Sequence, residues 1–146
     1  MVIPFIENDG GSKFWADPNI SHHDCVIRSI AIATDKCYAT IWNIFWDRMN
    51  PKSPSQGVPY YITNQYLEEI GFKRIIPITS LKLTDFVEKY NTIEFPIIFR
   101  VTITPIFSHI SVLKDGFIHD DKEWWDLTKW DPFITDIFSA DENMSG

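Results

Sequence analysis

The segment Asp24-Cys-Val-Ile-Arg-Ser-Ile-Ala-Ile-Ala-Thr34 joins a helix start to an almost unbroken apolar run. Apolar side chains at positions 26, 27 and 30–33 surround most of a helix and predict one that is buried on nearly all sides. Asp24 stands where an N-cap belongs, and it precedes Arg28 by four residues, the favourable order for an ion pair along a helix. We therefore expect Cys25 in the first turn of a buried helix over residues 25–34.

The stretch that follows predicts three further helices and one short strand. The expected helices cover about residues 38–49, 59–71 and 80–90, and the expected strand covers residues 73–78. Pro59 is a good first-turn residue, Gly71 is a stop signal, and Ser80 is expected to cap the last of these helices. Upstream of the first helix, residues 1–20 contain turn signals and are expected to be irregular.

Beyond residue 91 the pattern changes from helical to extended. The expected strands cover residues 95–103, 106–114 and 117–120. Asp115-Gly116, between the last two, is the strongest short signal for a hairpin. The aromatic tail over residues 124–138 is expected to add a last edge strand. Helices followed by an antiparallel sheet define an α+β fold, which we assign to a single domain over residues 1–146.

The composition describes an acidic globular protein. The chain has 146 residues, of which 45% are hydrophobic, and a formal net charge of −7. A negative field of this size disfavours binding to nucleic acid or to anionic membranes. No apolar stretch is long enough to span a membrane, and residues 1–8 lack the features of a signal peptide, so we expect a cytoplasmic protein. Two cysteines, Cys25 and Cys37, do not make a disulfide framework.

Cys25 and His109 supply the candidate chemistry. A cysteine at a helix start has its thiolate favoured by the helix dipole and by free backbone N–H groups, which can also hold an oxyanion. A thiol nucleophile further needs an imidazole within reach and a polar group that orients this imidazole. His109 is the best imidazole, because it lies on a strongly patterned strand just before the hairpin. Asn19, six residues before Cys25, is a weaker candidate for a side-chain donor to the oxyanion.

The hairpin register predicts a carboxylate beside His109. A two-residue turn sets the pairs Lys114–Phe117, Leu113–Ile118, Val112–His119 and Ser111–Asp120. His109 lies two residues from Ser111 and therefore points to the same face of the sheet. His109 and Asp120 are then diagonal neighbours within side-chain reach. A slip of one residue in this register would separate them.

These two ends of the chain resemble a known family. The stretch His23-Asp-Cys-Val-Ile-Arg-Ser-Ile-Ala-Ile-Ala-Thr34 and the stretch Ser108-His-Ile-Ser-Val-Leu-Lys-Asp-Gly-Phe-Ile-His-Asp120 resemble small papain-like cysteine peptidase domains of phages and bacteria. Those domains begin their helix with Asp-Cys-x-x-Arg-Ala and end with a histidine strand, Asp-Gly, and a strand ending in Asp. The chain is also similar to the peptidase domains of bacteriocin-processing transporters, which carry an amide side chain, usually Gln, six residues before the nucleophile.

The resemblance covers roughly residues 19–126 and implies a papain-like α+β fold, with the nucleophile helix packed on a C-terminal antiparallel sheet. It implies Cys25 as nucleophile, His109 as base and Asp120 as the orienting residue. Asn19 takes the place of the usual Gln, and Asp121 and Asp126 compete with Asp120 for the third position. Asp24, next to the thiol, opposes thiolate formation unless Arg28 neutralises it.

The function expected from these residues is that of a thiol hydrolase, a cysteine peptidase or isopeptidase, without a cofactor. The resemblance favours a phage-encoded protein that acts on a specific protein in the cytoplasm of a bacterial host. The alternative is a catalytically silent papain-like scaffold that binds and inhibits a host defence or regulatory protein. A zinc site at His22-His23-x-Cys25 is disfavoured, because adjacent histidines point apart and no second ligand pair has suitable spacing.

Overall fold

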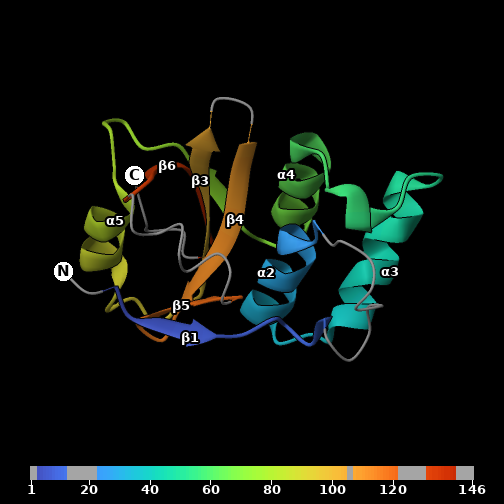
Figure 1. Ribbon diagram of the computed structural model, residues 1–146, viewed down its shortest axis with the longest axis horizontal. Helices are drawn as coiled ribbons and strands as arrows, with labels where there is room; N and C mark the ends of the chain where they lie inside the picture. Colours follow the sequence, from blue (N-terminus) through green and yellow to red (C-terminus); the bar gives the residue numbers. More distant parts are fainter. Residues whose placement is uncertain (1–2, 13–22, 105–106, 122–130, 141–146) are drawn as a thin grey trace.

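The computed structural model describes residues 3–12, 23–104, 107–121 and 131–140 (Figure 1). Within these ranges the helices are α2 (Cys25–Thr34), α3 (Tyr38–Met49), α4 (Tyr60–Glu69) and α5 (Leu83–Tyr90), with a short 3-10 turn η1 (Pro54–Gln56). The strands are β1 (Phe5–Glu7), β2 (Lys73–Ile75), β3 (Ile97–Thr104), β4 (Phe107–Lys114), β5 (Phe117–Asp120) and β6 (Phe133–Ser139). None of these helices is both long and apolar enough to cross a bilayer.

The strands form one mixed sheet in the order β1-β5-β4-β3-β6-β2. The α+β class is therefore correct, and the C-terminal strands β3 to β6 pair antiparallel with their neighbours as expected. The sheet as a whole is mixed, because the N-terminal strand β1 adds one parallel pair. β1 lies parallel to β5 at one edge, and β2 lies antiparallel to β6 at the other edge. The tail strand is also not at an edge, because β6 lies between β3 and β2. Residues 5–7, expected to be irregular, are a strand because β5 offers them backbone partners.

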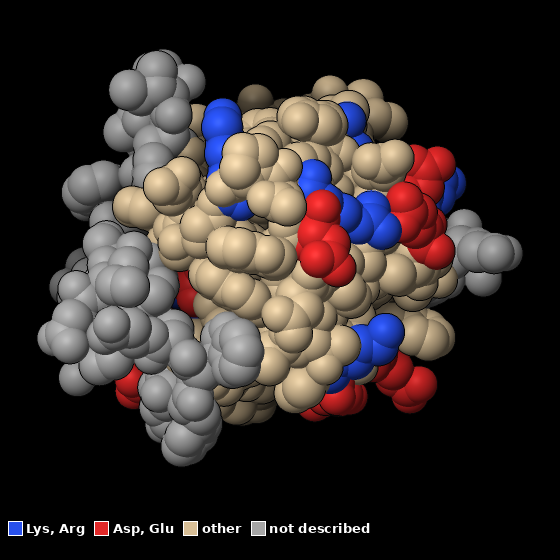
Figure 2. Space-filling view, turned by 90° about the vertical axis from the view of Figure 1, so that its right-hand side faces the viewer, with Lys and Arg blue, Asp and Glu red and all other residues tan. Residues whose placement is uncertain are grey.

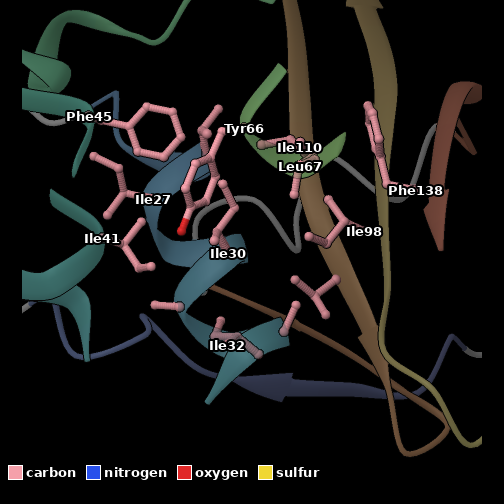
Figure 3. Packing of buried hydrophobic residues seen from close by; sticks show 14 of the residues in the cluster. Ile27, Ile30, Ile32, Ile41, Phe45, Tyr66, Leu67, Ile98, Ile110 and Phe138 are labelled. Carbon is pink, nitrogen blue, oxygen red and sulfur yellow. The ribbon is translucent and has the colours of Figure 1, made fainter. Parts of the chain in front are cut away.

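Helices cover both faces of the sheet, with α5 on one side and α2 and α4 on the other (Figure 1). Successive side chains of β3 supply the two cores in turn. Ile97 and Phe99 pack with Phe86 of α5, while Ile98 packs with the helices of the other side. Figure 3 shows the second core, in which Ile27 on α2 lies among side chains from α3, α4 and the sheet. The apolar run of α2 is buried because this core surrounds it.

The predicted bounds of α2 and α3 are confirmed, but those of β2 and α5 are not. β2 stops at Ile75 instead of Ile78. Ser80 does not cap α5, which begins at Leu83 with Lys82 in an extended conformation before it. The reason is tertiary: the Leu83 N–H donates to the Pro132 carbonyl at 2.9 Å and the Ile134 N–H donates to the Leu81 carbonyl at 2.7 Å. Residues 81–82 therefore run as an extended partner of the β6 start.

The hairpin register is confirmed for the three predicted pairs nearest the turn. Asp115 and Gly116 both have positive φ, 54° and 81°, as a two-residue type I′ turn requires. The observed pairs of β4 and β5 are Lys114–Phe117, Leu113–Ile118 and Val112–His119. This register positions the end of β5 for the contacts described next.

Candidate active site

Cys25 lies where the N-terminus of α2 meets the side of β4. β5 pairs with β4 as far as Val112–His119 and ends at Asp120. The next β4 residue whose peptide groups point toward β5 is Ile110, because these groups alternate in direction along a strand. There α2 replaces the strand: the Ser29 hydroxyl donates to the Ile110 carbonyl at 3.2 Å, and the Ile110 N–H donates to the Cys25 sulfur. These contacts hold the sulfur against β4.

His109 connects the thiol to a carboxylate. Its Nε2 is 2.7 Å from Oδ2 of Asp120, and both side chains are buried. The ring also forms a hydrogen bond with the Cys25 sulfur. Because Nε2 is engaged with Asp120, Nδ1 is the nitrogen that faces the thiol. The diagonal placement of His109 and Asp120 expected from the hairpin is thus observed, and the ring lies between sulfur and carboxylate.

The electrostatics favour a thiolate–imidazolium pair. Burial opposes ionisation of Cys25, but the charge and hydrogen bond of His109, the Ile110 N–H and the charge of Arg28 together lower the pKa of the thiol. Burial likewise opposes the charged form of His109, yet Asp120 and Cys25 raise the pKa of this imidazole to about 9. The two shifts have opposite signs, and near neutral pH they favour the nucleophilic form of sulfur and the acidic form of the ring.

The Asp24 side chain binds Arg28 instead of capping α2. It occupies the N-cap position of α2 but makes no capping hydrogen bond. Its carboxylate is 1% exposed, forms an ion pair with Arg28, and accepts a hydrogen bond of 2.5 Å from the Tyr38 hydroxyl. Burial and Asp24 raise the pKa of Tyr38, which therefore stays a donor. The negative charge of Asp24 next to Cys25 is thus balanced by Arg28, as expected from the sequence.

The third position of the site is occupied by Asp120. Its Oδ2 contacts His109, and its Oδ1 accepts the Asp121 N–H at 2.7 Å. The side chain of Asp121 instead lies 3.1 Å from an Arg28 nitrogen. Asp126, the other candidate, lies outside the described residues.

Two more of the candidate residues, besides Asp126, fall outside what the structure describes. These are Asn19, the candidate oxyanion donor, and His22. His23 is described, and its N–H donates to the Ser55 carbonyl at 2.9 Å. In the described ranges no three His, Cys, Asp or Glu side chains gather as metal ligands.

Sequence reasoning did not single out Ile110 or Tyr38. Ile110 acts through its backbone, so no side-chain type marks it. Tyr38 is the first residue of the helix that follows α2, and only the packing of α3 on α2 shows that its hydroxyl reaches Asp24.

Comparisons of the chain with protein-family models, with curated proteins and with solved structures give no match. The interpretation of the site therefore depends on its own geometry and charges.

Proposed function

We propose that the protein is a papain-like thiol hydrolase that cleaves peptide or isopeptide bonds, with Cys25 as nucleophile. The observation that carries this proposal is the position of the His109 ring, hydrogen-bonded to the Cys25 sulfur on one side and to Asp120 on the other. A nucleophile, a base and a group that orients the base are the parts that covalent hydrolysis needs. Each comes from a different element: α2, β4 and the end of β5.

In the first half of the reaction the Cys25 thiolate attacks the carbonyl carbon. The carbonyl oxygen takes the negative charge, and the first-turn N–H groups of α2 stabilise it, with the Asn19 amide proposed as a second donor. The His109 imidazolium then gives its proton to the departing nitrogen. The C–N bond breaks, an amine leaves, and the acyl group stays on sulfur as a thioester.

In the second half water replaces the amine. His109, now neutral, removes a proton from the water as its oxygen attacks the thioester carbon. Collapse of this intermediate breaks the C–S bond, releases the carboxylic acid and restores the thiolate–imidazolium pair. Asp120 keeps the ring oriented and its positive charge stabilised in both halves. We further propose a specific protein of a bacterial host as the substrate.

The alternative, a silent scaffold that binds a protein, is favoured by the exposed aromatic side chains over α3 and α4. Trp46, Tyr60 and Tyr61 are 43%, 54% and 72% exposed. Figure 2 views the molecule from the side of these helices, where wide uncharged areas separate small groups of charges. Large aromatic side chains with polar tips are typical of protein-binding surfaces.

The two functions differ in the reactivity of Cys25 toward an electrophilic peptide. We expect a short peptide that ends in a vinyl sulfone to add once per chain near neutral pH, with the adduct mapped to Cys25 by mass spectrometry. His109→Ala should abolish labelling in a folded protein. His119→Ala, which removes the neighbouring histidine, and Cys37→Ser should not. Absence of an adduct on Cys25, or equal labelling of His109→Ala, would refute the hydrolase and favour the binding scaffold.

A further inference from the structure

Arg28 has no part in the reaction steps above, yet its side chain contacts acidic residues on both sides of the site. The residue follows Cys25 by three positions on α2 and is 9% exposed. One nitrogen of its guanidinium pairs with Asp24. A second nitrogen, Nη2, lies 3.1 Å from Asp121 and 3.8 Å from Oδ1 of Asp120. The Arg28 side chain thus contacts both Asp24, which precedes Cys25, and Asp120, which binds His109.

The charges around Arg28 explain why a cation is needed there. The groups that face this region are the Cys25 thiol and Asp24 from α2 and its start, His109 from β4, Tyr38 from α3, and Asp120 with Asp121 from the end of β5. Asp24 and Asp120 are only 1% and 4% exposed. Buried carboxylates stay charged only when they are paired and hydrogen-bonded. Of the groups named, only the guanidinium is positive at every working pH.

We propose that Arg28 is a positioning residue of this site, whose guanidinium pairs with Asp24 through one nitrogen and lies against Asp120 with another. In this way Asp24 is prevented from opposing the thiolate, and Asp120 keeps one oxygen toward Arg28 and the other toward His109. The inference rests on the proposed function, since it assigns a role in the same reaction. The lowering of the pKa of Cys25 by Arg28, alongside the larger contribution of His109, agrees with it.

The shape of the side chain matters as well as its charge. A guanidinium is a planar fork that can meet two carboxylates at once, whereas a lysine ammonium is a point charge on a flexible stem. The chain also closes tightly over this residue: a Cβ at Gly10, whose φ is +66°, would come within 3.0 Å of the Arg28 carbonyl oxygen. The Arg28 backbone is therefore closely packed against Gly10. Arg28→Lys should supply the positive charge without contacting Asp24 and Asp120 at once.

The test measures the rate of Cys25 alkylation by iodoacetamide between about pH 5 and pH 10 in a Cys37→Ser background. We expect the background protein to react well below the ordinary thiol pKa. Arg28→Met should move the midpoint upward by at least about one unit, which lowers the rate by about tenfold or more at pH values well below both midpoints. Arg28→Lys should fall between the two. Arg48→Met is the matched control, because Arg48 pairs with Glu69 on the surface, and its profile should be unchanged.

The outcomes separate this inference from the proposed function. If the background protein itself titrates like an ordinary thiol, both are overturned. If its midpoint is low and folded Arg28→Met has the same midpoint, the hydrolase stands and the role of Arg28 is overturned. Should Arg28→Met not fold, the double variant Asp24→Asn/Arg28→Met removes both partners of the buried pair, a change that proteins tolerate better. This variant should also show an upward midpoint, since Asp120 still lacks its cation, and an unchanged midpoint overturns the inference.

Discussion

Replacing Asp120 by asparagine should remove most of the stabilisation of the His109 imidazolium. The pKa of His109 is raised from an ordinary value of 6.5 to about 9. Each pKa unit corresponds to about 1.4 kcal/mol, so the site favours the charged ring by roughly 3 kcal/mol. Burial works in the opposite direction, and Asp120 contributes more than Cys25. Asp120→Asn should therefore remove more than half of the rise and bring the pKa below about 8.

The measurement is a proton–carbon NMR titration of the histidine rings. The sequence has only four histidines, and a His109→Gln spectrum identifies the signal of interest. Asp115→Asn is the matched control, because it makes the same change in the exposed turn of the same hairpin and preserves a residue type that accepts the positive φ. It should leave the pKa of His109 near 9. A folded Asp120→Asn protein whose His109 still titrates near 9 would show that Asp120 does not stabilise the imidazolium.

The same substitution has a pH-dependent effect on stability. A histidine whose folded pKa is raised contributes stability that is fully present below its ordinary pKa of 6.5 and lost as pH rises through about 9. The loss of unfolding free energy in Asp120→Asn should thus be largest below pH 6.5 and shrink above 9. Urea denaturation at both ends of this range measures the difference, and a loss that grows with pH would contradict the assignment.

Two further outcomes are expected from the same structure. Cys25→Ala should lower the pKa of His109 by less than Asp120→Asn does, because the thiolate contributes less than Asp120 to the raised pKa. The same NMR titration measures both shifts, and the reverse order would contradict this expectation. Asp136→Ala should reduce the free energy of unfolding by about 3–5 kcal/mol, because it leaves the guanidinium of Arg100, 2% exposed, without the carboxylate that now lies 2.7 Å away. A loss below about 1 kcal/mol in urea denaturation would show that this buried pair is not needed.

The parts of the fold that the sequence predicted well depend on local signals. Asp115-Gly116 fixed the turn type, the turn fixed the register, and the register placed His109 beside Asp120. The bounds of α2 and α3 followed from apolar periodicity for a similar reason, since each helix forms its backbone hydrogen bonds within itself.

The parts that were missed depend on distant partners. β1 is three residues long and half exposed, so no alternation marks it, and its pairing with β5 joins segments more than 100 residues apart. The sequence of β6 indicates a strand but does not show which strands it pairs with. The position of β6 inside the sheet, between β3 and β2, could therefore not be predicted. Ser80 has the chemistry of a cap, but the pairing of residues 81–83 with the start of β6 outweighs one capping hydrogen bond.

The claim that Cys25 is a thiolate held by the His109 imidazolium can be tested by the ultraviolet absorbance of thiolate as a function of pH. In Cys37→Ser the chain has one thiol, so the titration belongs to Cys25. We expect the thiolate band to be present near neutral pH and to disappear only in acid, while His109→Gln moves the transition toward an ordinary thiol pKa of about 8.5. A band that first appears near 8.5 in the protein with His109 intact would contradict the claim.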